Sequence, residues 1–378
     1  MLDLSALFYT TKEQTCFLNE LDLTPGEKDG ISKAKNDVRE ALRTGIPRVM
    51  RENGYEGKTV IPRFFIQGSW AYKTLNRPCH TPPQQSDVDD GVYLPMSLVQ
   101  EEERPSIASS FFFEAAEGAL KSLVEKNGWT LVTTKPTCIR IEISELAHID
   151  IPLYAIPDKQ FLLITEKFEA RRLLGNVAVM DSAPDHWDSL PSDKVLLAHR
   201  EENWMKSDPR AMKDWFVGQV EKMGEQLRRI VRYLKAFRDS QWPKGGPSSI
   251  LLMAAAVPLF EANLRRDDLA LLQVLKGLPA ALRSGVVNPT DSNSYLTDAL
   301  TPEALEDAAQ KFEKFDAYLD GAIHANDATQ ACTWLGQMLG DRFPNRPDLV
   351  GTISIAAAVA SVPAEAGPIE PVKRTKAG

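Results

Sequence analysis

Acidic side chains recur on two predicted strands. Residues 87–94 predict a strand in which Asp87 and Asp89 project together while Val88 points into the core. A third carboxylate, Asp150, stands between two isoleucines of a later apolar strand. Adjacent carboxylates repel unless a cation separates them, and such oxygen ligands suit Mg²⁺. We expect the three acids to hold two Mg²⁺ ions, with Mn²⁺ as the alternative, which activate a hydroxyl and stabilise leaving pyrophosphate.

A phosphate-binding turn is predicted just before this acidic strand. An apolar strand over residues 63–67 ends at Gly68 and Ser69 and opens into a short helix. Glycine lets a phosphate approach closely, and the backbone N–H groups and the Ser69 hydroxyl can donate to phosphate oxygens. Gly68 and Ser69 are therefore candidates for holding a triphosphate beside the metal ions.

Each of these patterns also has a structural interpretation. Gly-Ser alone carries little information, and Asp-Val-Asp after a Gln/Ser-rich loop is also typical of a solvated turn. Asp90 points away from Asp87 and Asp89, and His148, which shares a face with Asp150, fits a structural role. The combination of a Gly-Ser turn, an acid pair and a single acid in an apolar strand favours catalysis.

The elements that position these residues divide the chain into two halves. A helix over residues 30–53, bent at Pro47, precedes five predicted strands and a second helix; the strands cover residues 63–67, 87–94, 129–134, 138–144 and 148–154 and the helix residues 107–126. From Ser207 onwards the patterns are helical, over residues 215–242, 246–255, 268–276, 302–322 and 328–339. From Val362 no apolar periodicity remains, which predicts a disordered tail.

Composition excludes several classes of function. With 43% hydrophobic and 25% charged residues among 378, the chain reads as globular, of a size for two domains. No apolar stretch is long enough to span a membrane, and a net charge of −8 argues against strong nucleic-acid binding. The four cysteines form no CxxC pair, so we expect no zinc site and a reducing, cytoplasmic setting.

Several extended blocks closely resemble the bacterial cGAS/DncV-like nucleotidyltransferases. The blocks are residues 68–76 (GSWAYKTLN), 87–96 (DVDDGVYLPM), 148–157 (HIDIPLYAIP), 203–209 (NWMKSDP), 234–242 (LKAFRDSQW) and 245–250 (GGPSSI). They recur in one order and cover about residues 60 to 260 densely. The resemblance fades beyond about residue 280, where residues shape the base pocket.

The resemblance implies an α+β fold. Its parts are a polymerase-β-like nucleotidyltransferase core with a mixed sheet and a helical domain like that of oligoadenylate synthases. We expect the core with its N-terminal helix over residues 1–205, the helical domain closing the cleft over 206–361, and a disordered tail over 362–378.

The resemblance also assigns site residues. Asp87, Asp89 and Asp150 match the metal triad, and Gly68 and Ser69 match the phosphate-binding turn. Nucleotide-contacting candidates outside these motifs are Tyr72, Lys235, Ser248 and Ser249. Lys235 and Ser249 match positions that contact the donor triphosphate, where a compact cation and a hydroxyl at a helix start suit phosphate. Lys235 could also be a solvated charge on a long helix, and the Tyr72 ring could stack on a base or pack against a helix.

The function implied is synthesis of a 3′,3′-cyclic dinucleotide, cyclic GMP–AMP from ATP and GTP, as a bacterial antiphage messenger that activates an effector. A linear oligonucleotide synthase and an antibiotic-adenylylating transferase are the enzymatic alternatives, and a degenerate nucleotide sensor is the non-enzymatic one. Some relatives are conjugated through their C-terminus by an E1–E2-like ligase. We therefore expect such a partner to act on Gly378, which has no β-carbon and fits a narrow channel.

Overall fold

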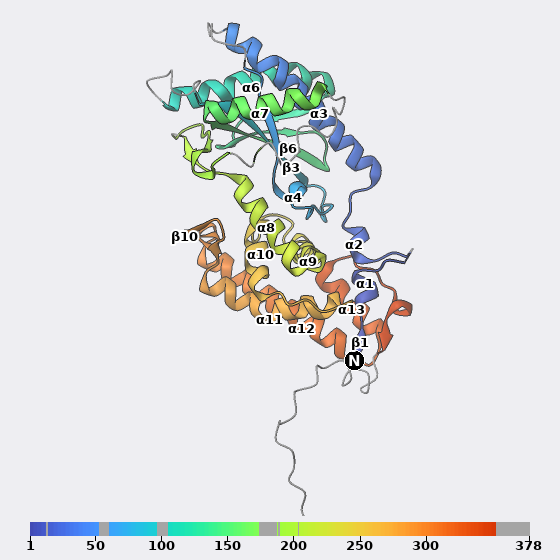
Figure 1. Ribbon diagram of the computed structural model, residues 1–378. Coiled ribbons are helices and arrows are strands. Elements are labelled where there is room, and N and C mark those ends of the chain that lie inside the picture. Colours follow the sequence, from blue (N-terminus) through green and yellow to red (C-terminus); the bar gives the residue numbers. More distant parts are fainter. Residues whose placement is uncertain are drawn as a thin grey trace, which may run out of the picture.

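The computed structural model describes residues 1–12, 14–52, 60–96, 105–173, 187, 190–202 and 204–352. In Figure 1 the elements form two groups, one above the other, joined through α8 (Pro209–Met223). The upper group contains a sheet and helices, and the lower group is built mainly of helices. The predicted α+β class and the mixed sheet are thereby confirmed.

Within the described residues, seven strands form the sheet of the upper group. The order along it is β2-β3-β6-β5-β4, and β7 and β8 extend it from β6. Only β3 and β6 run parallel; the other pairs are antiparallel. The strand bounds are β2 Arg63–Ile66, β3 Ser86–Pro95, β4 Thr130–Val132, β5 Cys138–Glu142, β6 Ala147–Ile156, β7 Leu196–Leu197 and β8 Met205–Lys206.

Both faces of this sheet carry apolar clusters, and the cluster on one face is the larger of the two. Val88, Ile149 and Ile151 are fully buried there, together with apolar side chains of α3 (Pro25–Glu52) and α6 (Pro105–Asn127). The opposite face packs partly on α7 (Asp158–Leu173). Near α4 (Gly68–Ala71), which contacts β3, the Asp87 side chain is 41% exposed. Because side chains alternate along β3, Asp87 and Asp89 lie on this second face.

The lower group packs its helices around a second core. Its elements are α8, α9 (Glu225–Gln241), α10 (Ser249–Ala256), α11 (Asp267–Ser284), α12 (Pro302–His324), α13 (Ala328–Leu339) and the hairpin of β9 (Val287–Asn288) and β10 (Asp291–Tyr295). The predicted pattern over residues 215–242 is divided at Gly224, whose φ of 90° ends α8 and begins α9.

The N-terminal segment packs on the lower group. This segment contains β1 (Leu2–Asp3), α1 (Ser5–Phe8) and α2 (Phe17–Glu20), and β1 pairs with β11 (Gly351–Thr352). In the helical group α1 contacts α11 and α2 contacts α9; Figure 1 shows this segment at the lower group. The expected domain boundary at residue 205 stays a prediction. The helix expected over residues 30–53 begins earlier, at Pro25, and continues through Pro47; the expected tail lies outside the described residues.

Candidate active site

Parallel pairing of β3 and β6 assembles an acid cluster. In the register of these strands Asp87 lies opposite His148, and Asp89 lies opposite Asp150. Val88 and Ile149 face the core, so these four polar side chains share the other face of the sheet. Asp90 faces the opposite way, where its carboxylate forms a buried pair with Arg39 of α3 at 2.5 Å. The three predicted metal acids therefore lie together on one face.

An arginine and a histidine lie next to these acids. Arg140 of β5 donates to both carboxylate oxygens of Asp150, at 2.6 and 2.7 Å. The Nε2 of His148 lies 3.1 Å from Asp87 Oδ1 and 4.0 Å from Asp150 Oδ1. Its Nδ1 lies 2.9 Å from the Gln85 side-chain oxygen, so Gln85 orients the imidazole toward the acids.

The carboxyl of Asp89 is strongly influenced by its surroundings. Burial raises the pKa of its carboxyl well above the ordinary value, and the nearby Asp87 and Asp150 carboxylates raise the pKa further. Its Oδ2 lies against Gly68, which adopts a φ of 60°, and a β-carbon at Gly68 would collide with this oxygen. The glycine is thus needed both for the turn and for the room that Asp89 occupies.

The donor set of this cluster fits a metal ion. Ligand atoms of Asp87, His148 and Asp150 lie within 4.8 Å of one another. Asp87 Oδ1 and His148 Nε2 are buried and lie 3.1 Å apart, but neither makes a hydrogen bond of good geometry, with the other or with another described group. Such atoms are unfavourable unless a cation or another group satisfies them. Asp89 lies outside this set, with its Oδ2 against Gly68. Its direct ligation of a metal stays a prediction.

A cavity of about 190 Å³ lies between Asp87 of the acid cluster and the helical group. Four of the predicted site residues line it: Ser69, Asp87, Lys235 and Ser249. Ser69 and Asp87 come from the sheet group, and the other two come from α9 and α10. The tertiary fold therefore brings together candidates that lie up to 180 residues apart in the sequence.

Lys235 is a buried cation at the wall of this cavity. Its side chain is almost fully buried, and Nζ donates to the carbonyl of Thr74 at 2.6 Å. Burial lowers the pKa of Lys235 to about 7, and the neighbouring Arg238 lowers the pKa as well. The alternative of a solvated charge on a long helix is wrong.

The hydroxyls at the start of α10 have different partners. Ser249 Oγ accepts from Arg238 at 2.9 Å and faces the cavity. Ser248 is the N-cap of α10, and its Oγ accepts from the Leu251 amide at 3.1 Å. Ser248 therefore has a helix-capping role in this structure, and its contact with a nucleotide stays a prediction.

The ring of Tyr72 packs into the helical core. The residue is 6% exposed and lies edge-on to Phe216 of α8 at a centroid distance of 6.2 Å. Burial raises the pKa of its hydroxyl, and Asp89 contributes to the increase. The packing interpretation of Tyr72 fits this environment, and stacking on a base stays a prediction.

Three further residues of the site were missed from the sequence. Arg140 alternates with core isoleucines on β5, so the sequence predicts that its side chain points away from the core. Its pairing with Asp150 depends on the register of β5 and β6. Arg238 and Gln84 line the cavity from α9 and from the loop before β3. A single sequence contains no signal for the contact between those two segments, because it is made only in the folded chain.

Residues 62–154 match the family described as "Cyclic GMP-AMP synthase DncV-like, nucleotidyltransferase domain", and residues 224–352 match "Cyclic GMP-AMP synthase, C-terminal domain". A Vibrio cholerae cyclic GMP-AMP synthase is 36% identical over 331 residues, which are 83% of this chain and 75% of that protein. A cyclic GMP-AMP synthase from Escherichia coli is 40% identical over 247 residues, 62% of this chain and 56% of that protein.

Solved structures of Vibrio cholerae DncV share the fold. DncV bound to the linear intermediate pppA(3′,5′)pG is 29% identical with a TM-score of 0.75, covering 93% of this chain and 99% of that chain. A DncV mutant in complex with ATP, GTP and 5MTHFGLU2 has a TM-score of 0.78 at 29% identity, covering 93% and 100%. In the part of this chain that the structure describes, no helix has the length and apolar character needed to cross a membrane.

Proposed function

The chain belongs to the DncV-like nucleotidyltransferases, and from this premise we propose that it joins ATP and GTP into 3′,3′-cyclic GMP–AMP. The predicted family and enzyme class, a cyclic dinucleotide synthase, are confirmed by these matches. The observation that carries the proposal for this site is the cavity lined by Ser69, Asp87, Lys235 and Ser249. It combines an acid cluster with cations and hydroxyls that suit a triphosphate.

Two bound Mg²⁺ ions, held by Asp87, Asp89 and Asp150, would supply Lewis-acid stabilisation of the attacking hydroxyl and of the leaving pyrophosphate. The supporting observation is the group of buried oxygen and nitrogen atoms without hydrogen-bond partners in the acid cluster. Mn²⁺ would bind to the same oxygen-rich donor set.

The chain's own residues hold and orient the nucleotides. Lys235, Arg238 and the hydroxyls of Ser69 and Ser249 line the cavity that receives the donor triphosphate. Lys235 is protonated when it binds phosphate, because the anion favours the charged ammonium. Fixing the donor against the acid cluster turns bond formation into a step between pre-aligned groups, which lowers the entropic part of the barrier.

The reaction sequence is two successive 3′–5′ bonds made in one site. A 3′ hydroxyl attacks the α-phosphorus of the donor, the bond to pyrophosphate breaks, and the hydroxyl proton leaves to solvent. The linear intermediate then turns over and the second 3′ hydroxyl closes the ring with loss of a second pyrophosphate. The linear intermediate named for the Vibrio cholerae relative supports this order.

Incubation with the four labelled triphosphates, singly and in pairs, with Mg²⁺ tests the proposal. The expected product forms from ATP with GTP, resists phosphatase and is cleaved by a 3′–5′-specific nuclease. Phosphatase-sensitive product would instead indicate a linear oligonucleotide synthase. Transfer of AMP to an aminoglycoside would indicate an adenylylating transferase. No Mg²⁺-dependent pyrophosphate release from any combination would leave only a nucleotide sensor.

Three biological expectations stay predictions: an antiphage role through a downstream effector, cytoplasmic localisation, and conjugation of Gly378 by an E1–E2-like ligase. Gly378 lies outside the described residues. Co-expression with such a ligase tests conjugation, because a covalent adduct on a gel should depend on Gly378.

A further inference from the structure

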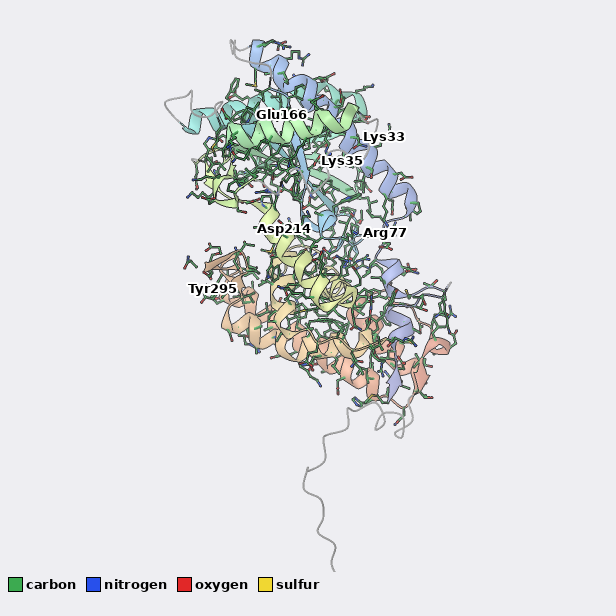
Figure 2. The ribbon with its side chains drawn as sticks, in the orientation of Figure 1. Lys33, Lys35, Arg77, Glu166, Asp214 and Tyr295 are labelled. Carbon is green, nitrogen blue, oxygen red and sulfur yellow. The ribbon has the colours of Figure 1, made fainter. Side chains whose placement is uncertain are left out.

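The segment between the phosphate-binding turn and the acidic strand lies along one side of α9. Residues 72–86, here called the connecting segment, leave α4 and enter β3. Figure 2 shows Arg77, in the middle of this segment, at the level where the two groups of elements meet. Several hydrogen bonds tie this segment to the helical group. Its backbone carbonyls accept from three side chains: Tyr72 O from Arg228 Nε at 3.0 Å, Thr74 O from Lys235 Nζ at 2.6 Å, and Arg77 O from Arg342 at 2.6 Å. The Asn76 side chain donates to the Arg232 carbonyl and accepts from the Arg232 side chain, at 2.9 Å each, and the His80 ring lies 3.3 Å from the Ser240 carbonyl.

Gln84 makes the last contact of this series, and it uses both ends of its amide. Its Nε2 donates to the carbonyls of Asp239 and Trp242, at 2.8 and 2.9 Å. Its Oε1 accepts from the amides of Cys79 and His80, at 3.0 and 3.1 Å. The nitrogen thus satisfies carbonyls at the C-terminal end of α9, which have no partner within the helix. The oxygen stabilises the turn of the connecting segment that contains Cys79, His80 and Gln84.

The position of Gln84 links the two walls of the cavity. Asp87 follows it by three residues on β3, and Asp239 stands one helical turn after Lys235 on α9. A change in the spacing of Gln84 and α9 therefore changes the spacing of the acid cluster and the triphosphate-binding side chains. Small misplacements of this kind reduce rates strongly, because reacting groups must be aligned within a fraction of an ångström.

We propose that Gln84 is a positioning residue, which sets the distance between the acid cluster and the triphosphate wall by capping the end of α9. This inference rests on the proposed function. Gln84 need not touch the reacting atoms, because its amide is fully used by the four backbone groups. A purely structural role would lower stability without changing the turnover of the folded enzyme.

Gln84→Glu separates the two roles of the amide. The carboxylate keeps an oxygen that can accept from Cys79 and His80, but it cannot donate to the carbonyls of α9. Gln241→Glu is the matched control. Gln241 lies at the same end of α9 and donates to Met338 O at 2.9 Å, a contact within the helical group alone. Both variants lose amide-to-carbonyl hydrogen bonding at one helix end, and only the first breaks a contact between the groups.

Steady-state kinetics with ATP, GTP and Mg²⁺, together with melting curves, decide the matter. We expect Gln84→Glu to lower kcat by about tenfold to a hundredfold. Its KM should rise as well, because Gln84 lines the cavity and the new carboxylate repels the triphosphate, so kcat at saturating nucleotide is the quantity compared. Gln241→Glu should keep wild-type kcat with a similar shift in Tm. If kcat, expressed per folded enzyme molecule, is the same for the two variants, the proposal is overturned.

A second variant covers the case in which the new carboxylate prevents folding. Gln84→Met has a similar volume but neither donor nor acceptor, and the same loss of kcat is expected from it. A folded Gln84→Met enzyme with wild-type kcat would likewise overturn the inference. Wild-type enzyme without turnover in this assay would contradict the proposed function instead, so the two failures are distinguishable.

Discussion

At the scale of single residues, the acid cluster balances repulsion with internal partners. Arg140 neutralises Asp150 through two hydrogen bonds, and the His148 imidazole approaches Asp87. Among the residues that the structure describes, none forms an ion pair with Asp89, and the pKa of its carboxyl is raised. Burial and the nearby carboxylates therefore disfavour a negative charge on Asp89 unless a cation binds.

Replacing Asp87 and Asp89 together with asparagine should lower turnover to below a few per cent of wild type. Two of the three carboxylates that would hold metal are then lost, while the fold stays intact because like-charge repulsion is relieved. Pyrophosphate release and circular dichroism measure the two effects. Asp193→Asn, at an exposed position, is the control. Substantial turnover in the double variant would remove these acids from the metal site.

Metal affinity should depend on pH through Asp89. A proton occupies its carboxyl below the raised pKa and must leave when a metal binds, so Mn²⁺ affinity rises with pH. In the metal-free protein the folded state binds more protons than the unfolded one above pH 3.8, so stability falls as pH rises toward the raised pKa. Electron paramagnetic resonance and melting curves measure these trends.

Asp89→Asn is the decisive comparison for that pH dependence. The variant has no proton to lose at this position, so its metal-free Tm should vary less with pH than that of the wild type. Parallel Tm curves for the two proteins would contradict the assignment of a raised pKa to Asp89.

Triphosphate binding should depend on pH through Lys235. Its pKa is about 7 in the folded protein, against an ordinary 10.5. Nucleotide binding above pH 7 should therefore take up a proton, and affinity should fall as pH rises. Lys235→Ala should weaken binding by about 1–3 kcal/mol and remove this pH dependence. Calorimetry in buffers of different ionisation enthalpy measures both effects.

Ser69→Ala is the companion variant for Lys235. It should weaken triphosphate binding by about 1–3 kcal/mol as well, but keep the proton uptake, because the hydroxyl does not titrate in this range. Stability gives an independent check on the lysine. The folded state binds fewer protons than the unfolded one between pH 7 and 10.5, so the free energy of unfolding rises with pH in that window.

At the scale of elements, the close contact of α3 with α6 depends on one glycine. A β-carbon at Gly45 would overlap Ala119 and lie 2.8 Å from its Cα, whereas a β-carbon at Gly30 of the same helix meets nothing within 4 Å. An alanine at either position changes helix propensity in the same way, but only an alanine at Gly45 changes the packing of α3 on α6. The helices lie directly over the sheet that carries the acid cluster.

Gly45→Ala and Gly30→Ala should change stability in opposite directions. Gly30→Ala should stabilise by about 0.5–1 kcal/mol, because alanine loses less backbone entropy in a helix. Gly45→Ala should destabilise by about 1–3 kcal/mol, because α3 must move away from α6. Denaturant unfolding measures both values. Stabilisation by both substitutions would show that the two helices do not pack this closely.

At the scale of the whole molecule, the chain's first residues complete the core of the lower group. Phe8 is fully buried, with its ring 5.2 Å from the rings of Tyr233 and Phe343. Nearby, the buried Asp268 carboxylate accepts from the Leu4 amide and the Ser5 hydroxyl, at 3.1 and 3.0 Å. The N-terminal segment therefore stabilises helices that are more than 200 residues away in sequence.

Phe8→Ala should destabilise the protein by about 3–5 kcal/mol, because it leaves a cavity between buried rings. Tyr9→Ala is the matched control. Its ring is 37% exposed and contacts the Arg229 guanidinium at 4.1 Å, an interaction of about 1 kcal/mol or less. Denaturant unfolding compares the variants, and equal losses for both would contradict the packing of this segment.

The local features of the site follow from neighbouring residues and could be predicted before the fold was known. Asp87 and Asp89 oppose Val88, and Asp150 stands between core isoleucines, because the period of a strand is a property of adjacent residues. Extended motifs identified the family, and the comparisons confirmed it. The positive φ of Gly68 likewise follows a local turn signal.

Which of these residues contact one another depends on the folding of the whole chain. The pairing of Arg140 with Asp150 needs strand register, and the contact of Gln84 with the end of α9 joins residues 155 or more positions apart. Such contacts depend on the closing of long loops and on burial summed over many side chains, and no local pattern encodes them. For the same reason the burial of Lys235, which lowers its pKa to about 7, became visible only in the folded chain.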